Sequence, residues 1–187
     1  MVTIDTEEPL AVAVVRAIQT GDLATLKRLL DSNPGLATAR LGDDDPEGMS
    51  RTLMHVVTDW PGRFPNGAAT VAVLIEAGAD VNGRFRGPHT ETPLHWAASS
   101  DDVEVLDALI DAGADIEAPG GVIGGGPPLA DARAFAQWQA AHRLVERGAR
   151  TTLQDSATLG LMDRLEDSFA GDPPPASDEI DPAFWGA

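Results

Sequence analysis

Hydrophobic and polar positions along the chain follow the spacing of short amphipathic helices. In one stretch the apolar residues fall at positions i, i+3, i+6 and i+7 and so share one face of a helix: Val103, Leu106, Leu109 and Ile110. A shorter helix is predicted just before it, because Thr92 can cap the free N–H groups and Pro93 at the first helical position loses no hydrogen bond. The segment therefore predicts two helices joined by a turn.

This pattern of two helices returns along the chain. The glycines that end the second helix of each pair lie 35 residues apart: Gly78, Gly113 and Gly148. The start of the first helix also recurs, in the segments Thr52-Leu53-Met54-His55, Thr92-Pro93-Leu94-His95 and, in degenerate form, Pro127-Pro128-Leu129-Ala130. One helix pair cannot bury its own apolar face, so the units must stack on one another.

Two segments identify the repeat. Thr92-Pro93-Leu94-His95-Trp96-Ala97-Ala98 resembles the first-helix signature of the ankyrin-repeat family, and Ala112-Gly113-Ala114-Asp115 resembles its repeat ending. The resemblance covers about residues 9–170 and implies an all-α ankyrin-repeat solenoid of stacked helix-turn-helix units, about five repeats. The segments 59–67 and 91–96 also resemble bacterial ankyrin-repeat proteins, a likeness that implies no activity.

We expect one ankyrin-repeat domain over residues 1–171. Its units are predicted at about 9–40, 47–82, 87–117, 122–152 and 153–171, and the second carries an extra segment, Trp60 to Gly67, between its helices. Residues 172–187 are predicted to be an acidic, proline-rich tail in which Phe184 and Trp185 resemble the start of a further repeat. Either the chain is truncated there, which we favour, or this aromatic pair folds back over the last unit.

Charge narrows the classes of partner. The 187 residues include 30 Asp and Glu against 13 Lys and Arg, a formal net charge of −17, and Lys27 is the only lysine. Nucleic acids and anionic membranes bind basic surfaces, so we expect neither as a partner, and a basic partner is favoured. The longest apolar run, Leu10 to Val15, is too short to span a bilayer, so a soluble, cytoplasmic protein is predicted.

The sequence assigns no catalytic residue, cofactor or metal. With no cysteine, disulfides, thiolate zinc sites and a cysteine nucleophile are excluded. An acidic loop matches the first half of a calcium-binding loop, at Asp43, Asp45, Glu47 and Gly48. Its twelfth position is Met54, where calcium needs a bidentate Glu. The glycine-rich loop 120–126 lacks the Lys and Ser or Thr of a phosphate-binding loop, which favours a flexible or tightly turning inter-repeat loop over a lid above a ligand.

Histidine and tryptophan positions separate structural from partner-facing candidates. His55 and His95 stand at the signature position, where the resemblance implies hydrogen bonds to the backbone of adjacent loops. His89 lies in a connecting loop, where the family presents variable side chains to partners. Trp60 either packs under its own insertion or contacts a partner, and Trp96 is interpreted as a core residue facing the helix pair.

The resemblance implies that partners bind the loop tips and the exposed end of the first helix of each unit. The residues at those positions are Met49, Arg51, Asp59, Trp60, Pro88, His89, Glu91, Ser99, Ser100 and Phe135. We therefore predict a non-catalytic protein–protein interaction module that binds a protein or peptide, expected to be basic, on its concave groove and loop tips.

The alternative is a small-molecule-binding protein or an unusual enzyme. Asp59, Trp60, His89 and the loop Gly120 to Gly126 are unusual loop features of neighbouring units, and stacking would bring them to one side. A closed apolar pocket with a carboxylate or imidazole pointing inward would favour this alternative, whereas a flat, open, charged groove would argue against it.

Overall fold

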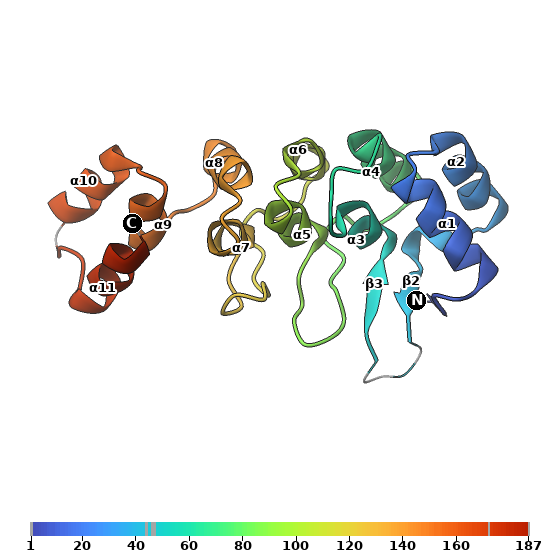
Figure 1. Ribbon diagram of the computed structural model, residues 1–187, viewed down its shortest axis with the longest axis horizontal. Helices are drawn as coiled ribbons and strands as arrows, with labels where there is room; N and C mark the ends of the chain where they lie inside the picture. Colours follow the sequence, from blue (N-terminus) through green and yellow to red (C-terminus); the bar gives the residue numbers. More distant parts are fainter. Residues whose placement is uncertain (1, 44, 46–47, 172, 187) are drawn as a thin grey trace.

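The computed structural model describes residues 2–43, 45, 48–171 and 173–186 and shows helix pairs side by side in one row (Figure 1). The pairs are α1 (Pro9–Gln19) with α2 (Leu23–Ser32), α3 (Leu53–Thr58) with α4 (Gly67–Glu76), α5 (Pro93–Ser99) with α6 (Val103–Asp111), α7 (Pro128–Ala134) with α8 (Trp138–Glu146), and α9 (Leu153–Thr158) with α10 (Met162–Ala170). Within this described part of the chain, the arrangement confirms the predicted all-α solenoid of stacked helix pairs.

A small sheet near the first two helix pairs was not predicted. Its strands are β1 (Thr3–Ile4), β2 (Arg40–Gly42) and β3 (Ser50–Thr52), with β2 in the middle, parallel to β1 and antiparallel to β3. Arg40 is buried there and donates to Ser50 Oγ (2.7 Å) and to the carbonyl oxygens of Ser50 (2.5 Å) and Arg84 (2.8 Å). These bonds fix β3, which leads directly into α3.

Small residues let neighbouring units approach closely. Ala97 and Ala98 of α5 and Ala132 of α7 are fully buried in the core that runs through the stack. On α6 the fully buried face differs from the predicted one: it consists of Val105, Leu106 and Leu109. Val103 and Ile110 are only partly buried. Val103 is the first residue of α6, where the helix has just begun and fewer neighbours cover it.

Two histidines connect successive units, as the resemblance implied. His55 Nε2 lies 3.1 Å from the carbonyl oxygen of Glu91, and His95 Nε2 lies 3.1 Å from that of Gly126. Because a carbonyl oxygen only accepts, each Nε2 carries the hydrogen, and each Nδ1 accepts from the N–H of the threonine three residues before it, Thr52 or Thr92. Burial lowers the pKa of His55 to about 3 and also lowers the pKa of His95.

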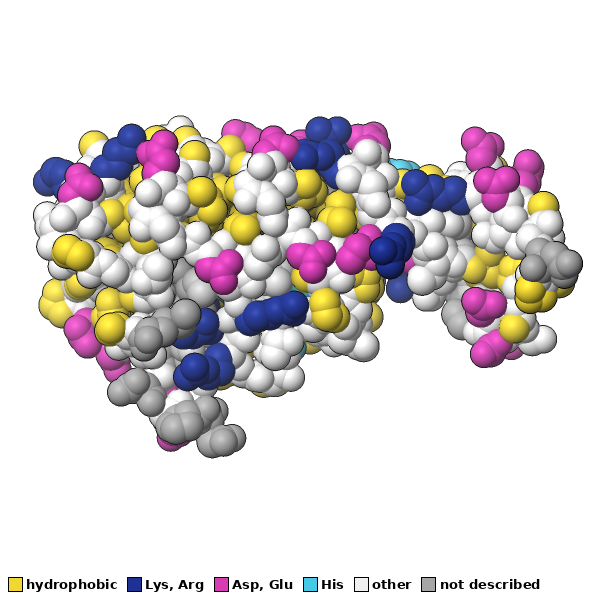
Figure 2. Space-filling model, turned by 180° about the vertical axis from the view of Figure 1, so that it is seen from behind, with side chains coloured by type: hydrophobic (Ala, Val, Ile, Leu, Met, Phe, Trp, Pro, Cys, Tyr) yellow, Lys and Arg dark blue, Asp and Glu magenta, His cyan; other side chains and the backbone are white. Residues whose placement is uncertain are grey.

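The second helices of the units are joined by charged side chains. Between α6 and α8, Asp107 Oδ1 accepts from Arg143 Nε (2.8 Å) and from Arg147 Nη1 (2.6 Å). Seen from behind, acidic and basic side chains stand next to one another along the upper edge of the molecule (Figure 2). Some of the acidic side chains are therefore paired with arginine side chains between units of the stack.

The C-terminal segment contains a helix, α11 (Ser177–Gly186), which packs against α9 (Figure 1). Ala183 on this helix is buried. The sequence analysis predicted an acidic tail with the start of a further repeat here, and the structure shows that residues 177–186 of this tail form a helix. The side chains of Phe184 and Trp185 lie outside the described residues, so their predicted role is left as a prediction.

Candidate functional site

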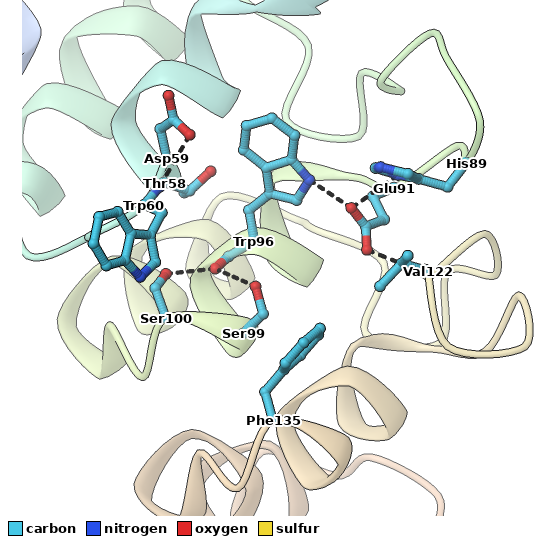
Figure 3. A pocket seen from close by; sticks show the side chains of 10 residues that line it. All are labelled: Thr58, Asp59, Trp60, His89, Glu91, Trp96, Ser99, Ser100, Val122 and Phe135. Atoms are coloured by element: carbon cyan, nitrogen blue, oxygen red, sulfur yellow. Dashed lines mark hydrogen bonds and ion pairs between the residues drawn. The ribbon is translucent and has the colours of Figure 1, made fainter.

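A pocket opens where three successive units meet, on the side that carries the loops (Figure 3). Its volume is about 240 Å³. The lining residues come from the end of α3, the loop before α5, α5 itself, the loop before α7 and the end of α7: Thr58, Asp59, Trp60, His89, Glu91, Trp96, Ser99, Ser100, Val122 and Phe135. The surface of the pocket is mostly apolar, with carboxylates at two places.

Most of the residues predicted to face a partner line this pocket. They are Asp59, Trp60, His89, Glu91, Ser99, Ser100 and Phe135. Arg51 stands beside it on β3 and pairs with Asp59. Met49 and Pro88 are exposed outside it, in the β2–β3 connection and in the loop before α5. The stacking of units thus gathers residues that are up to 76 positions apart in sequence.

Trp60 projects from the insertion and is 83% exposed, so the alternative that it packs under its own segment is wrong. The rest of the insertion is held in place by the next unit. Arg63 N–H donates to Asp102 Oδ2 (2.6 Å), and the Arg63 guanidinium donates to the carbonyl oxygen of Asp101 (3.0 Å). Gly62, at φ 75°, lies so close to the residue that follows α5 that a Cβ there would lie 2.9 Å from Ser100 Cβ. The loop therefore holds an exposed aromatic side chain on a fixed backbone.

Trp96 forms one wall of the pocket, which corrects its interpretation as a core residue. The side chain is half-buried: its ring lies against His55 at 4.8 Å between centroids and against Phe85 at 5.6 Å. Its indole Nε1–H donates to Glu91 Oε2 (2.7 Å). Thr58 is a further lining residue that the sequence analysis missed, and Val122 belongs to the loop Gly120 to Gly126 that it named only as a whole. The signal in the sequence was the acidic Glu91 five residues before Trp96. A tryptophan N–H needs a hydrogen-bond partner, and an acidic partner points away from an apolar core.

Glu91 places a carboxylate at the inner end of the pocket, and its side chain is only 7% exposed. Besides Trp96, the backbone N–H of Val122 donates to it, to Oε1 at 3.0 Å. His89 Nδ1 lies 2.9 Å from Oε2, and its ring stacks on Phe85 at 4.7 Å between centroids. The donors from Trp96 and Val122 are neutral, so among these contacts of Glu91 only a protonated His89 would carry an opposite charge.

A second carboxyl group lies behind Glu91. Asp131 of α7 is fully buried, and its Oδ1 accepts from Ile123 N–H (3.3 Å). Burial, then a hydrogen bond and charge repulsion from Glu91, raise the pKa of Asp131 to about 7. Asp131 therefore keeps its proton up to near-neutral pH next to Glu91, a feature the sequence analysis did not single out.

The glycine-rich loop turns tightly over these carboxyl groups. Gly120 N–H donates to the carbonyl oxygen of Gly125 (2.9 Å), and Gly121 N–H donates to that of Gly126 (3.0 Å). A Cβ at Gly121 would lie 2.9 Å from the Asp131 carboxyl oxygens. This geometry confirms the interpretation of a tight inter-repeat turn and explains the need for glycine beside Asp131.

The described residues include no cluster of three or more His, Asp or Glu side chains suited to hold a metal ion. Of the acidic loop compared with a calcium site, Glu47 lies outside those residues. None of the helices in the described ranges is long and apolar enough to cross a membrane.

Comparisons with known proteins agree with the fold. The family model for ankyrin repeats (three copies) matches residues 14–119. The chain is 33% identical over 132 residues to palmitoyltransferase AKR1 of Lachancea kluyveri, which covers 70% of this chain and 15% of that protein. It is 32% identical over 110 residues to palmitoyltransferase AKR1 of Kluyveromyces lactis, covering 58% and 13%. Against palmitoyltransferase AKR1 of Candida albicans it is 38% identical over 77 residues, covering 39% and 8%. The chain therefore spans at most 15% of the length of these relatives.

Proposed function

This chain belongs to the ankyrin-repeat family, and we propose that it is a non-catalytic interaction module that binds a basic protein or peptide on its loop side, with the pocket between α3, α5 and α7 as the anchor. The observation that carries the proposal is the exposure of two aromatic side chains at one pocket: Trp60 is 83% exposed and Phe135 is 46% exposed. Aromatic side chains supply large contact areas at a low cost in conformational entropy and often dominate binding energy.

Charge supports a basic partner. The formal net charge of −17 attracts a cationic chain and speeds its encounter at low ionic strength. The same charge argues against nucleic acid and anionic membranes as partners. At the pocket, Asp59 is paired with Arg51, while Glu91 has no arginine or lysine partner among the ion pairs of the described residues.

The proposal is tested by selecting random peptides, displayed on phage, for binding to the wild-type chain. A second selection uses a pocket variant in which Trp60→Ala and Phe135→Ala are combined, and a third uses Trp138→Ala. Trp138 is the matched control, because it is 46% exposed on α8 and does not line the pocket.

We expect the wild-type chain and Trp138→Ala to enrich the same peptides, rich in Arg and Lys, and the pocket variant to retain few of them. Enriched peptides without basic residues would refute the basic partner. Equal retention by the pocket variant would refute the pocket as the anchor.

A second candidate function, a small-molecule-binding protein or an unusual enzyme, is favoured by one observation. An imidazole, His89, and two carboxyl groups, Glu91 and Asp131, lie together beside a pocket, an arrangement suited to acid–base chemistry. If this is the function, a metabolite extract should raise the melting temperature of the wild-type chain and not that of His89→Ala. The absence of any such shift would leave the interaction module as the better proposal.

A further inference from the structure

We infer that the pocket receives a single arginine side chain of the partner, with the guanidinium between the aromatic rings and its charge facing Glu91. This inference rests on the proposed function, since it names the group by which a basic partner would be anchored. Four features of the pocket carry it: its size, its aromatic walls, its buried charge and its free hydrogen-bond acceptors.

The size of the pocket fits one side chain. Sites for drug-sized ligands usually measure about 300–1,000 Å³, whereas this pocket measures about 240 Å³. The pocket is also open to solvent on the side of Trp60, which is 83% exposed. A long side chain can enter from that side while its backbone stays outside, along the loops.

The walls of the pocket suit a flat cation. Trp60, Trp96 and Phe135 come from three successive units and face one space (Figure 3). Aromatic faces attract cations, and the guanidinium group is planar, stacks on such rings and is weakly hydrated. A lysine ammonium is more strongly hydrated and gains less from the same walls.

The charge at the inner end of the pocket lacks a permanent counter-ion. A buried carboxylate is normally paired with an opposite charge, yet the hydrogen-bond donors to Glu91 are the neutral N–H groups of Trp96 and Val122. The imidazole of His89, whose Nδ1 lies 2.9 Å from Oε2, carries a positive charge only when it is protonated. Asp131, the carboxyl group behind it, adds no positive charge. Arg84 donates to the carbonyl oxygens of Thr90 and Pro119 instead.

Acceptors are available for the N–H groups of the guanidinium. Ser99 Oγ and Ser100 Oγ both donate to the carbonyl oxygen of Trp96, at 3.1 and 2.5 Å, so their lone pairs remain free to accept. Both hydroxyl groups lie between the aromatic walls (Figure 3). The Glu91 oxygens already accept from two donors, so its part is mainly electrostatic.

The test uses the full chain labelled with ¹⁵N and three probes: the Nα-acetyl amides of arginine, lysine and citrulline. Citrulline is the neutral isostere of arginine and therefore isolates the charge. The readout is the indole N–H signals, because the chain has four tryptophans and two of them line the pocket. Each signal is assigned from one Trp→Phe variant.

We expect the arginine probe to shift the signals of Trp60 and Trp96 and to leave that of Trp138 in place. The citrulline and lysine probes should bind at least about tenfold more weakly. Trp60→Ala or Phe135→Ala should weaken arginine binding about fivefold or more, with Trp138→Ala as the unchanged control. Citrulline or lysine binding as tightly as arginine, or shifts centred on Trp138, would overturn the inference.

The inference and the proposed function can fail separately. If basic peptides are selected and need Trp60 and Phe135, but arginine and citrulline probes bind alike, the module stands and the arginine site is wrong. If the arginine probe binds the pocket but no peptide selection depends on these residues, the site stands and the proposed function is wrong.

Discussion

The buried carboxyl group of Asp131, beside the pocket, makes the stability of the folded chain depend on pH. Its pKa, raised to about 7, lies above that of an aspartate in the unfolded chain, about 3.9. The folded state therefore keeps a proton that the unfolded state has lost, and the stability that this proton contributes is present at low pH and is lost as pH rises towards 7. The steepest loss allowed is about 1.4 kcal/mol per pH unit.

Replacing this group gives a prediction with a clear sign. In Asp131→Asn an amide N–H takes the place of the carboxyl O–H toward Glu91, and position 131 no longer titrates. The free energy of unfolding of the variant minus that of the wild-type chain should therefore increase by about 1–3 kcal/mol when the pH rises from 5 to 8. Urea unfolding at both pH values measures this, and a difference that does not change with pH would contradict the raised pKa of Asp131.

The histidine that joins α3 to the next loop predicts the opposite trend. Burial lowers the pKa of His55 to about 3, whereas an unfolded histidine titrates near 6.5. The unfolded state therefore binds the extra proton first, so stability is complete above about pH 6.5 and falls as pH decreases toward 3. His55→Gln should be less stable than the wild-type chain at pH 7, and this deficit should shrink at pH 5. A deficit of constant size in urea unfolding would show that His55 does not titrate on unfolding.

At the scale of elements, the carboxylate of Asp102 both caps α6 and helps to hold the insertion between α3 and α4. Asp102 caps α6 by accepting from Val105 N–H (3.3 Å) and holds the insertion by accepting from Arg63 N–H (2.6 Å). Loss of the cap alone costs about 1 kcal/mol.

The two tasks predict different results for two variants. Asp102→Ala should lose about 1–3 kcal/mol of stability, because the cap and the bond to Arg63 are both removed. Asp102→Ser keeps a capping oxygen on a shorter side chain, so it should recover most of the stability and still weaken peptide binding. Chemical denaturation and peptide titration measure the two effects, and a Ser variant with unchanged binding would show that Arg63 does not position Trp60.

The helices were predictable from the sequence because their causes are local. Thr92 and Pro93 mark one helix start, and Gly113 ends the helix that follows, so spacing alone indicates the pair. The small sheet was not predictable, since β2 is only three residues long and is stabilised by contacts of Arg40 with oxygens up to 44 positions away. A contact between residues so far apart in the sequence leaves no local pattern of residues from which it could be predicted.

The pocket was predictable in part. Loop positions such as Asp59 and His89 follow from the repeat, but the wall made by Trp96 depends on rings that meet only after stacking. The same reason hides the pair of Glu91 and Asp131, which lie 40 positions apart and meet beneath a glycine-rich turn.

For the whole molecule, charge and architecture act together. Three successive units contribute residues to the pocket, so its shape depends on how these units stack. The net charge of −17 acts over a longer range than the pocket and is screened by salt. A basic partner should therefore associate more slowly at higher ionic strength in stopped-flow measurements, in the wild-type chain and in Trp60→Ala alike. If Trp60→Ala changed this salt dependence, the net charge alone would not set the rate of association, and its role could not be separated from that of the pocket.

The most direct test of the pocket as the anchor is calorimetric titration of one selected basic peptide. The titrations compare the wild-type chain, the variant that combines Trp60→Ala with Phe135→Ala, and Trp138→Ala. A pocket that anchors the partner predicts a loss of affinity of about tenfold or more for the combined variant and little change for Trp138→Ala. Equal affinities for all three chains would contradict it.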